Sequence, residues 1–514
     1  MSADIVLKNA NVITMDARQP KAALVAITGD QISLAGGSDD LESVAGAGTR
    51  VIDCQGKTVV PGFNDAHFHL FSLVRKLLSI DLSPASVCSI ADIKEAVRRK
   101  AAQTPPGTWL SGTDYNEFYL AEKRCPTRRD LDETAPNHPV VLSHRSLHAC
   151  VLNSRALELA GIGMETPEPE GGRIERDPET GEPNGILIGM LGYIRSRVMP
   201  PFSAAELAEG IALANRLFLS QGITSLGEAT VSNGTDRWEI ICGFILNGGL
   251  RSRMTMMAGA PAWTGFQRVN LKTGSGDNLM RLGAVKVMLG IEEKGVKPPQ
   301  DELNQLALAC HEAGFQLAFH AVAEDTVAAA AQALEYINGH SPVAKRRHRI
   351  EHCGECPPSL LERLRKLGAV IVTQPPFIYY HGERYLATVA PSQLPWLYRL
   401  KSPLASGVVV AGSSDAPVVP NNPLVGIYAA VTRQAESGQV LLPGEAISAR
   451  QALALYTINA AYASFEEGIK GSITPGKLAD IVVLSDDPTG VPPERIKDIR
   501  VEMTILGGEV VWEG

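Results

Sequence analysis

The stretch Pro61-Gly-Phe-Asn-Asp-Ala-His67-Phe-His69 follows a short β-branched run, Thr58-Val-Val, near the start of the chain. In a β-strand the side chains of residues i and i+2 point to the same face, so His67 and His69 can present two imidazoles to one metal ion. A single pair of this kind is weak on its own. Its meaning depends on what other parts of the chain bring beside it.

Seven further apolar or β-branched runs recur through the middle of the chain, with helical patterns between most of them. They are Gly222-Ile-Thr-Ser-Leu, Arg253-Met-Thr-Met-Met, Gly283-Ala-Val-Lys-Val-Met, Gln316-Leu-Ala-Phe-His, Arg349-Ile-Glu-His, Ala369-Val-Ile-Val-Thr and Val408-Val-Val-Ala-Gly. Strands that alternate with helices predict an α/β fold with a parallel sheet. Together with Thr58-Val-Val they number eight, which closes a TIM-type (β/α)8 barrel, predicted here over residues 61–465.

Both ends of the chain have a different sequence pattern, in which short runs typical of β-strands are separated by turn residues. Examples are Ala23-Leu-Val-Ala-Ile near the start and Asp480-Ile-Val-Val-Leu near the end. Neither end alone supplies enough strands to bury a face. We therefore expect residues 1–60 and 466–514 to form one composite β-sandwich domain.

A long insertion, about residues 70–220, separates the first two strands of the predicted barrel. It begins where the first strand ends, on the side of a barrel where active sites lie. We interpret it as a lid or substrate-binding region, with a structural embellishment as the alternative. His148, Tyr115 and Arg173 from this insertion, and Tyr380 from later in the chain, are candidates for contact with substrate, and a packing or surface role is the alternative for each.

Polar residues stand at the ends of the other predicted barrel strands. His320, His352 and Asp415 stand at the ends of predicted strands five, six and eight, and Lys286 is a lone charge inside Ala-Val-Lys-Val-Met. A buried lysine is costly unless it is paired, neutral or chemically changed. Because the carboxyl ends of barrel strands meet at one mouth, these residues are expected to converge with His67 and His69.

Several motifs resemble the amidohydrolase superfamily, in particular the amidohydrolase-3 branch that contains YtcJ-like proteins and N-substituted formamide deformylases. The resemblance covers nearly the whole chain. Its motifs include Pro61-Gly-Phe-Asn-Asp-Ala-His-Phe-His, Arg347-His-Arg-Ile-Glu-His, Gly412-Ser-Ser-Asp-Ala-Pro and Gly471-Ser-Ile-Thr-Pro-Gly-Lys-Leu-Ala-Asp-Ile-Val-Val-Leu. The resemblance also implies a (β/α)8 barrel with a composite β-sandwich, in agreement with the strand count.

The resemblance implies a role for each of these residues. His67, His69 and Asp415 would bind a buried divalent metal ion, and His320 and His352 a more exposed one. Lys286 would carry a carbamate that bridges the two ions. Imidazole and carboxylate ligands favour zinc, and manganese, iron, cobalt and nickel remain open.

The implied reaction is hydrolysis of a C–N bond in a small molecule: an amide, formamide, carbamate, urea or cyclic amide. A metal-bound hydroxide would attack the carbonyl, and Asp415 would take up its proton and pass it to the leaving amine. One alternative is a mononuclear deaminase of an aminated ring. Such enzymes typically lack the strand-four lysine and have a glutamate three residues after the strand-five histidine, whereas here Lys286 is present and Glu324 lies four residues after His320. The other alternative is an inactive scaffold, which predicts degraded ligands.

Composition and charge limit the classes of binding partner and the cellular compartments that we expect for this protein. The net charge is -8, no long basic stretch occurs and aromatic residues make up only 5%, so a nucleic-acid-binding surface is not expected. The start of the chain lacks the pattern of a secretory signal, and no apolar run is long enough to span a membrane. Eight scattered cysteines are too sparse for a disulfide framework. We expect a cytoplasmic protein, with a homodimer as the base-rate expectation for its assembly.

Overall fold

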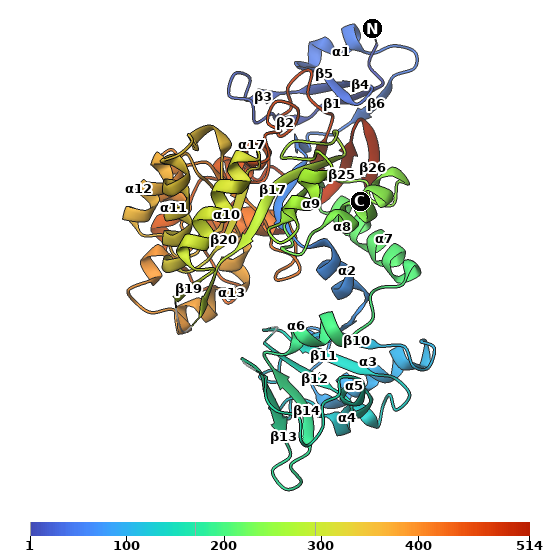
Figure 1. Cartoon of the computed structure of the whole chain (residues 1–514). Coiled ribbons are helices and arrows are strands. Elements are labelled where there is room, and N and C mark those ends of the chain that lie inside the picture. Colours follow the sequence, from blue (N-terminus) through green and yellow to red (C-terminus); the bar gives the residue numbers. More distant parts are fainter. Residues whose placement is uncertain (1, 147, 170, 293–294) are drawn as a thin grey trace. The chain divides into compact units, whose positions relative to one another are not determined.

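The computed structural model describes residues 2–146, 148–169, 171–292 and 295–514. It contains two compact units (Figure 1). Unit 1 comprises Met1–Leu70 and Ala214–Gly514, and unit 2 comprises Phe71–Leu213. In the described parts of the chain, no helix has both the length and the apolar character needed to cross a bilayer.

The centre of unit 1 is an eight-stranded sheet in which every neighbouring pair is parallel. In chain order its strands are β8 (Phe63–Phe68), β15 (Ile223–Glu228), β16 (Arg253–Gly259), β17 (Met280–Met288), β20 (Leu317–Ala321), β21 (Arg349–His352), β22 (Val370–Thr373) and β23 (Val410–Gly412). Helices follow most of the strands, among them α8 (Thr235–Leu246), α10 (Gln300–Glu312), α11 (Glu324–Asn338), α12 (Pro358–Lys366), α13 (Pro376–Thr388) and α15 (Pro423–Thr432). The predicted (β/α)8 barrel is confirmed.

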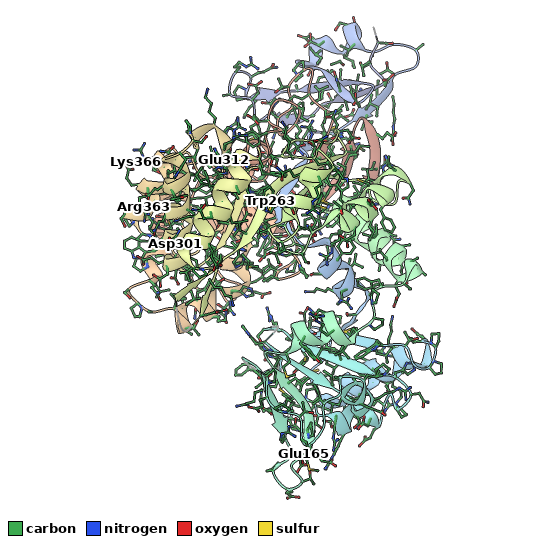
Figure 2. The ribbon with its side chains drawn as sticks, in the orientation of Figure 1. Glu165, Trp263, Asp301, Glu312, Arg363 and Lys366 are labelled. Atoms are coloured by element: carbon green, nitrogen blue, oxygen red, sulfur yellow. The ribbon has the colours of Figure 1, made fainter. Side chains whose placement is uncertain are left out.

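The outer helices are amphipathic, as the sequence pattern requires. Asp301 on α10 and Lys366 on α12 are exposed (Figure 2), whereas Leu303 and Leu364 on the same helices are fully buried. The apolar faces pack inward and leave the charged faces in solvent.

The barrel closes just beyond the last strand rather than along it. The backbone N–H of Asp415 donates to the carbonyl of His67 at 2.9 Å, and that of His69 donates to Ala416 at 2.8 Å. The first and last strands therefore meet where three of the candidate ligands lie.

One strand assignment was wrong. Thr58-Val-Val belongs to β7 (Thr58–Pro61), which pairs with β24 (Ile481–Leu484) and with β2 (Asn11–Ile13), outside the barrel. The first barrel strand is β8, which begins two residues later. Gly62 alone separates the two strands, and the chain passes there from one sheet to the other.

The composite β-sandwich consists of two sheets. The first has the order β5-β4-β1-β6, with β5 (Gln31–Gly36), β4 (Leu24–Thr28), β1 (Ile5–Lys8) and β6 (Arg50–Asp53). The second has the order β26-β25-β24-β7-β2-β3, with β26 (Glu509–Glu513), β25 (Val501–Leu506) and β3 (Lys21–Ala22) in addition to the strands already named. One apolar cluster joins residues of both sheets, including Leu7, Val25, Val59, Ile481 and Ile505. The sheets therefore share a core that is built from both ends of the chain, as predicted.

Unit 2 is a mixed six-stranded sheet with its own core. Its order is β13-β14-β12-β11-β10-β9, with β13 (Arg173–Arg176), β14 (Pro183–Ile188), β12 (Ala149–Leu152), β11 (Val140–His144), β10 (Leu110–Tyr115) and β9 (Ile80–Asp81). Helix α3 (Ile90–Ala102) buries Ile93 and Val97 in this core. The insertion thus has a defined fold, and its action as a lid stays a prediction.

Candidate metal centre

The six candidate ligands come from five barrel strands. His67 lies in β8 and His69 just after it, Lys286 lies near the end of β17, His320 in β20, and His352 ends β21, while Asp415 follows β23. Each therefore stands at or near the carboxyl end of its strand, which is where barrel enzymes place their catalytic groups.

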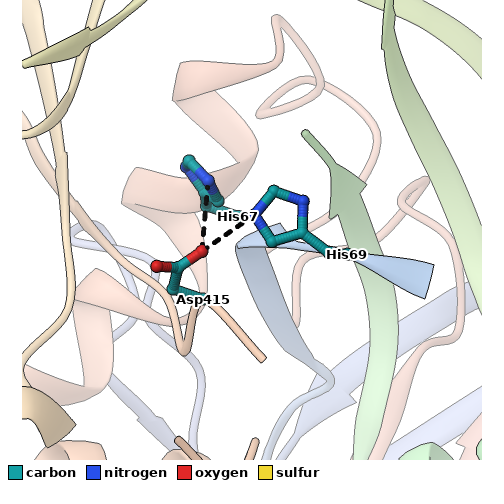
Figure 3. Close-up of side chains that lie close together, drawn as sticks. All are labelled: His67, His69 and Asp415. Atoms are coloured by element: carbon teal, nitrogen blue, oxygen red, sulfur yellow. Dashed lines mark ion pairs between the residues drawn. The ribbon is translucent and has the colours of Figure 1, made fainter. Parts of the chain in front are cut away.

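His67, His69 and Asp415 form the tightest group (Figure 3). The ligand atoms of these three residues all lie within 4.8 Å of one another. Asp415 Oδ1 is 3.0 Å from His69 Nε2 and 3.5 Å from His67 Nε2. Asp415 has a left-handed backbone (φ 58°), an uncommon conformation for a residue other than glycine, and such positions cluster at functional sites.

Partners behind the two histidines determine which ring nitrogen carries the proton. His67 Nδ1 is 2.5 Å from Glu351 Oε2, and Arg349 holds that carboxylate with contacts of 2.7 and 3.0 Å. An ionised carboxylate can only accept, so His67 Nδ1 carries the proton and Nε2 presents a lone pair.

The same argument applies to His69. Thr230 Oγ1 donates its one proton to Glu228 at 2.6 Å and therefore accepts from His69 Nδ1 at 2.9 Å. Both inward-facing Nε2 atoms thus carry lone pairs. Asp415 Oδ1, which faces them, is buried and has no hydrogen-bond partner among the described residues.

Three electron-pair donors that converge without a proton between them suit a cation. Buried polar atoms without a partner are rare in folded proteins and call for a specific reason. Two imidazoles and a carboxylate are ordinary ligands of zinc and similar ions. The residues present therefore fit the metal that the sequence led us to expect.

The other three candidates lie beside this group. Lys286 Nζ is 3.1 Å from His67 Nε2, and the rings of His67 and His352 are 5.0 Å apart between centroids. His352 Nε2 and His320 Nδ1 are 2.9 Å apart. The structure therefore brings all six residues together.

Burial determines the charge states in the centre. It lowers the pKa of His320 to about 2, with a further lowering from His352, and it lowers the pKa of His67 well below the ordinary value. Burial also lowers the pKa of Lys286 to about 8, although Glu351 and Asp415 oppose this shift. The imidazoles of His67 and His320 are thus neutral, as metal ligands must be, and the lysine amine loses its proton unusually easily.

The other candidate residues have different surroundings. Tyr115 is fully buried in the core of unit 2 with its hydroxyl 3.9 Å from Cys125 Sγ, which is the environment of a packing residue. Arg173 is exposed and pairs with Glu175 at 2.7 Å, and His148 is exposed after β11. Tyr380 lies half-buried on α13, with its ring 5.0 Å from that of Tyr379. Their contact with a substrate stays a prediction.

Sequence reasoning missed the residues behind the ligands. Glu351, Thr230 and Gln374 contact the outer nitrogens of His67, His69 and His352. Glu351 carried only a weak signal, because its strand, Arg349-Ile-Glu-His, is mostly polar, unlike the apolar run around Lys286. Thr230 and Gln374 carried none.

Comparison with known proteins agrees with this geometry. The model of the amidohydrolase family matches residues 50–512. This chain belongs to the amidohydrolase family. It is 30% identical to the N-substituted formamide deformylase of Arthrobacter pascens, over 99% of this chain and 98% of that protein, and 28% identical to the putative amidohydrolase YtcJ of Bacillus subtilis, over 90% of this chain and 91% of that protein.

Solved structures agree as well. An uncharacterized metal-dependent hydrolase from Pyrococcus furiosus superposes with a TM-score of 0.75 at 25% identity, covering 94% of this chain and 99% of that chain. A zinc-bound adenosine deaminase from Xanthomonas campestris superposes with a TM-score of 0.58 at 12% identity, over 99% of this chain and 93% of that one, a likeness of fold alone. Membership of the amidohydrolase family identifies this protein as a hydrolase that acts on C–N bonds.

Proposed function

We propose that the protein hydrolyses an amide, formamide, carbamate or cyclic amide at a binuclear metal centre. The convergence of His67, His69 and Asp415 with Lys286 and the His320–His352 pair supports this proposal. A mononuclear site would leave a buried lysine beside the metal without a function, and burial of an unused amine is costly. The buried position of Lys286 beside His67 is the strongest support for a binuclear rather than a mononuclear centre.

Different residues of the centre are proposed to hold the two metal ions. His67, His69 and Asp415 hold one ion, and His320 and His352 hold the other. When bound, two divalent ions supply a hydroxide at neutral pH and polarise the substrate carbonyl. Zinc is the ion proposed, because its preferred ligands are those present.

Lys286 is proposed to join the two halves of the centre as a carbamate. Its neutral amine forms an N–C bond with carbon dioxide and releases a proton, which leaves an anionic group in place of a cation. The low pKa of the buried amine favours this reaction. The carbamate supplies oxygen ligands where an ammonium group would repel metal ions.

Asp415 is proposed to move the proton. Its carboxylate accepts a proton from the attacking water and returns it to the nitrogen that leaves, so that the amine departs neutral. Its place beside both His67 and His69 keeps the carboxylate at the reacting atoms rather than in solvent.

A hydrolysis screen of purified, zinc-loaded protein tests the proposal. The compounds are N-formyl, N-acyl, carbamate and cyclic amide series, and the readout is release of amine and acid. We expect turnover of one series, and a loss of about 100-fold or more in kcat for Asp415→Asn, the range typical of a general acid–base residue. Glu362→Gln, which changes an exposed carboxylate on α12, is the matched control and should keep full activity.

Two results would contradict the proposal. Full hydrolytic activity of Asp415→Asn would exclude the proton transfer. Release of ammonia from an aminated ring, with one metal per chain, would favour the deaminase alternative.

The compartment and assembly are proposed on less specific grounds. All eight cysteines are free, which suits a reducing cytoplasm. A homodimer remains the base-rate expectation.

A further inference from the structure

His352 differs from His67 and His69 in the residue that contacts its Nδ1 atom. Its Nδ1 is 2.8 Å from Oε1 of Gln374, the side-chain amide of the residue after β22. The amide nitrogen of Gln374 donates to Ser413 Oγ at 3.0 Å, and Ser413 Oγ donates to the carbonyl of Thr373 at 3.0 Å. Gln374 and Ser413 are both fully buried.

The direction of each hydrogen bond follows from the last one. The carbonyl of Thr373 can only accept, so the single proton of Ser413 points toward it. Ser413 Oγ must then accept from Gln374, which places the amide NH2 on that side and the amide oxygen toward His352. An amide oxygen can only accept, so Nδ1 of His352 carries the proton and Nε2 presents its lone pair to His320.

A flipped amide would have the opposite effect. It would turn an N–H group toward Nδ1 of His352, which would then accept and leave the proton on Nε2, and it would leave Ser413 without its donor. Ser413 therefore determines which end of the Gln374 amide faces His352.

We propose that Gln374 is a positioning residue, held by Ser413, that selects Nε2 of His352 as a ligand atom for the second metal ion. The proposal rests on the binuclear centre proposed above. It also predicts a difference between the two halves of the centre. His67 donates to a carboxylate, which raises the basicity of an imidazole, whereas His352 donates to a neutral amide.

Two variants of Gln374 separate these effects. Gln374→Met keeps the length of the side chain and removes the acceptor, whereas Gln374→Glu keeps an acceptor and adds charge. Gln316→Met is the matched control, because Gln316 is a buried barrel glutamine that donates to the carbonyls of Arg347 and Ala463 and contacts no candidate ligand.

The measurement is zinc affinity by competition with a chelator, together with the number of ions bound per chain. We expect Gln374→Met to weaken the binding of one of the two zinc ions by about 10–100-fold, which is the usual effect of losing a hydrogen-bond partner of a ligand. The affinity for the other ion should not change. Gln374→Glu should restore or exceed wild-type affinity, and Gln316→Met should match the wild type. If Gln374 had a merely structural role, glutamate would not restore the zinc affinity, and the loss of affinity would not be confined to one ion.

Several results would overturn the proposal. Wild-type affinity for both ions in Gln374→Met would show that the amide does not position His352. Equal weakening in the glutamate and methionine variants would exclude the acceptor as the cause. Should Gln374→Met fail to fold, Ser413→Ala tests the same relay by freeing the amide to flip, and unchanged affinity there would also refute it.

Failure of the binuclear centre itself gives a different result. In that case wild-type protein binds a single ion, and His352→Ala leaves the metal content unchanged. Loss of one of two ions in His352→Ala, with no effect of Gln374→Met, would refute the positioning role alone.

Discussion

Loading of the metal centre is expected to depend on carbon dioxide, with a pH dependence that reports the amine of Lys286. Only the neutral amine can form a carbamate, and burial lowers the pKa of this amine from 10.5 to about 8. Near pH 7.5 about a quarter of the lysine is then neutral, whereas a lysine with its ordinary pKa would be neutral in about one molecule in a thousand. Burial thus raises the reactive fraction about 200-fold.

The assay begins with metal-free protein in buffer without carbon dioxide. Labelled carbon dioxide is supplied at a fixed dissolved concentration near pH 6.5, 7.5 and 8.5, and the carbamate is followed by carbon NMR. Since a higher pH removes the proton from Lys286, the initial rate should rise about eightfold from the lowest to the middle pH and only about threefold from the middle to the highest. Zinc added afterwards should be taken up in proportion to the carbamate formed.

Two variants calibrate this experiment. Lys286→Met should give no carbamate signal at the site and no carbon dioxide dependence of zinc uptake. Lys366→Met, which removes an exposed lysine of α12, should behave as the wild type. A rate that does not change with pH, or a full carbamate signal in Lys286→Met, would show that the neutral amine of Lys286 is not the group that reacts with carbon dioxide.

Three further predictions concern stability. Asp480→Asn breaks a buried bidentate pair with Arg253 (2.7 and 2.9 Å) that joins β16 to the β-sandwich, so it should cost about 3–5 kcal/mol of unfolding free energy; an unchanged denaturant midpoint would contradict this. Burial lowers the pKa of His348 to about 3, so below pH 6.5 the unfolded chain binds a proton that the folded chain does not. Stability should therefore fall toward pH 3 by up to about 1.4 kcal/mol per pH unit, and urea titrations near pH 5.5 and 6.5 should show a smaller fall in His348→Gln than in the wild type. Removal of metal with a chelator should lower the melting temperature, because ions present at about 1,000 times their Kd contribute about 4 kcal/mol; a melting temperature that ignores the chelator would count against a resident metal.

The barrel could be predicted because its pattern is local. Each strand is a short apolar run beside a helix with its own period, and these signals do not depend on distant parts of the chain. The prediction of the first barrel strand was wrong because its assignment depends on distant parts of the chain. Thr58-Val-Val is as β-branched as any barrel strand, and only its pairing with Asn11–Ile13 and with Ile481–Leu484 assigns it to the sandwich.

The candidate ligands could be predicted because polar residues interrupt or end apolar runs. Lys286 and His320 stand out in this way, whereas Glu351 does not, because its strand, Arg349–His352, is mostly polar. Gln374 and Thr230 could not be recognised, because a neutral polar residue after a strand is typical of any loop. Their importance arises from hydrogen bonds to residues that lie far away in sequence.

The central claim, a binuclear centre with a modified lysine, is tested most directly by metal analysis of the zinc-saturated protein together with density or NMR evidence at Lys286. We expect two ions per chain and a carbon dioxide adduct on Lys286. One ion per chain at saturation, with Lys286 unmodified, would contradict it.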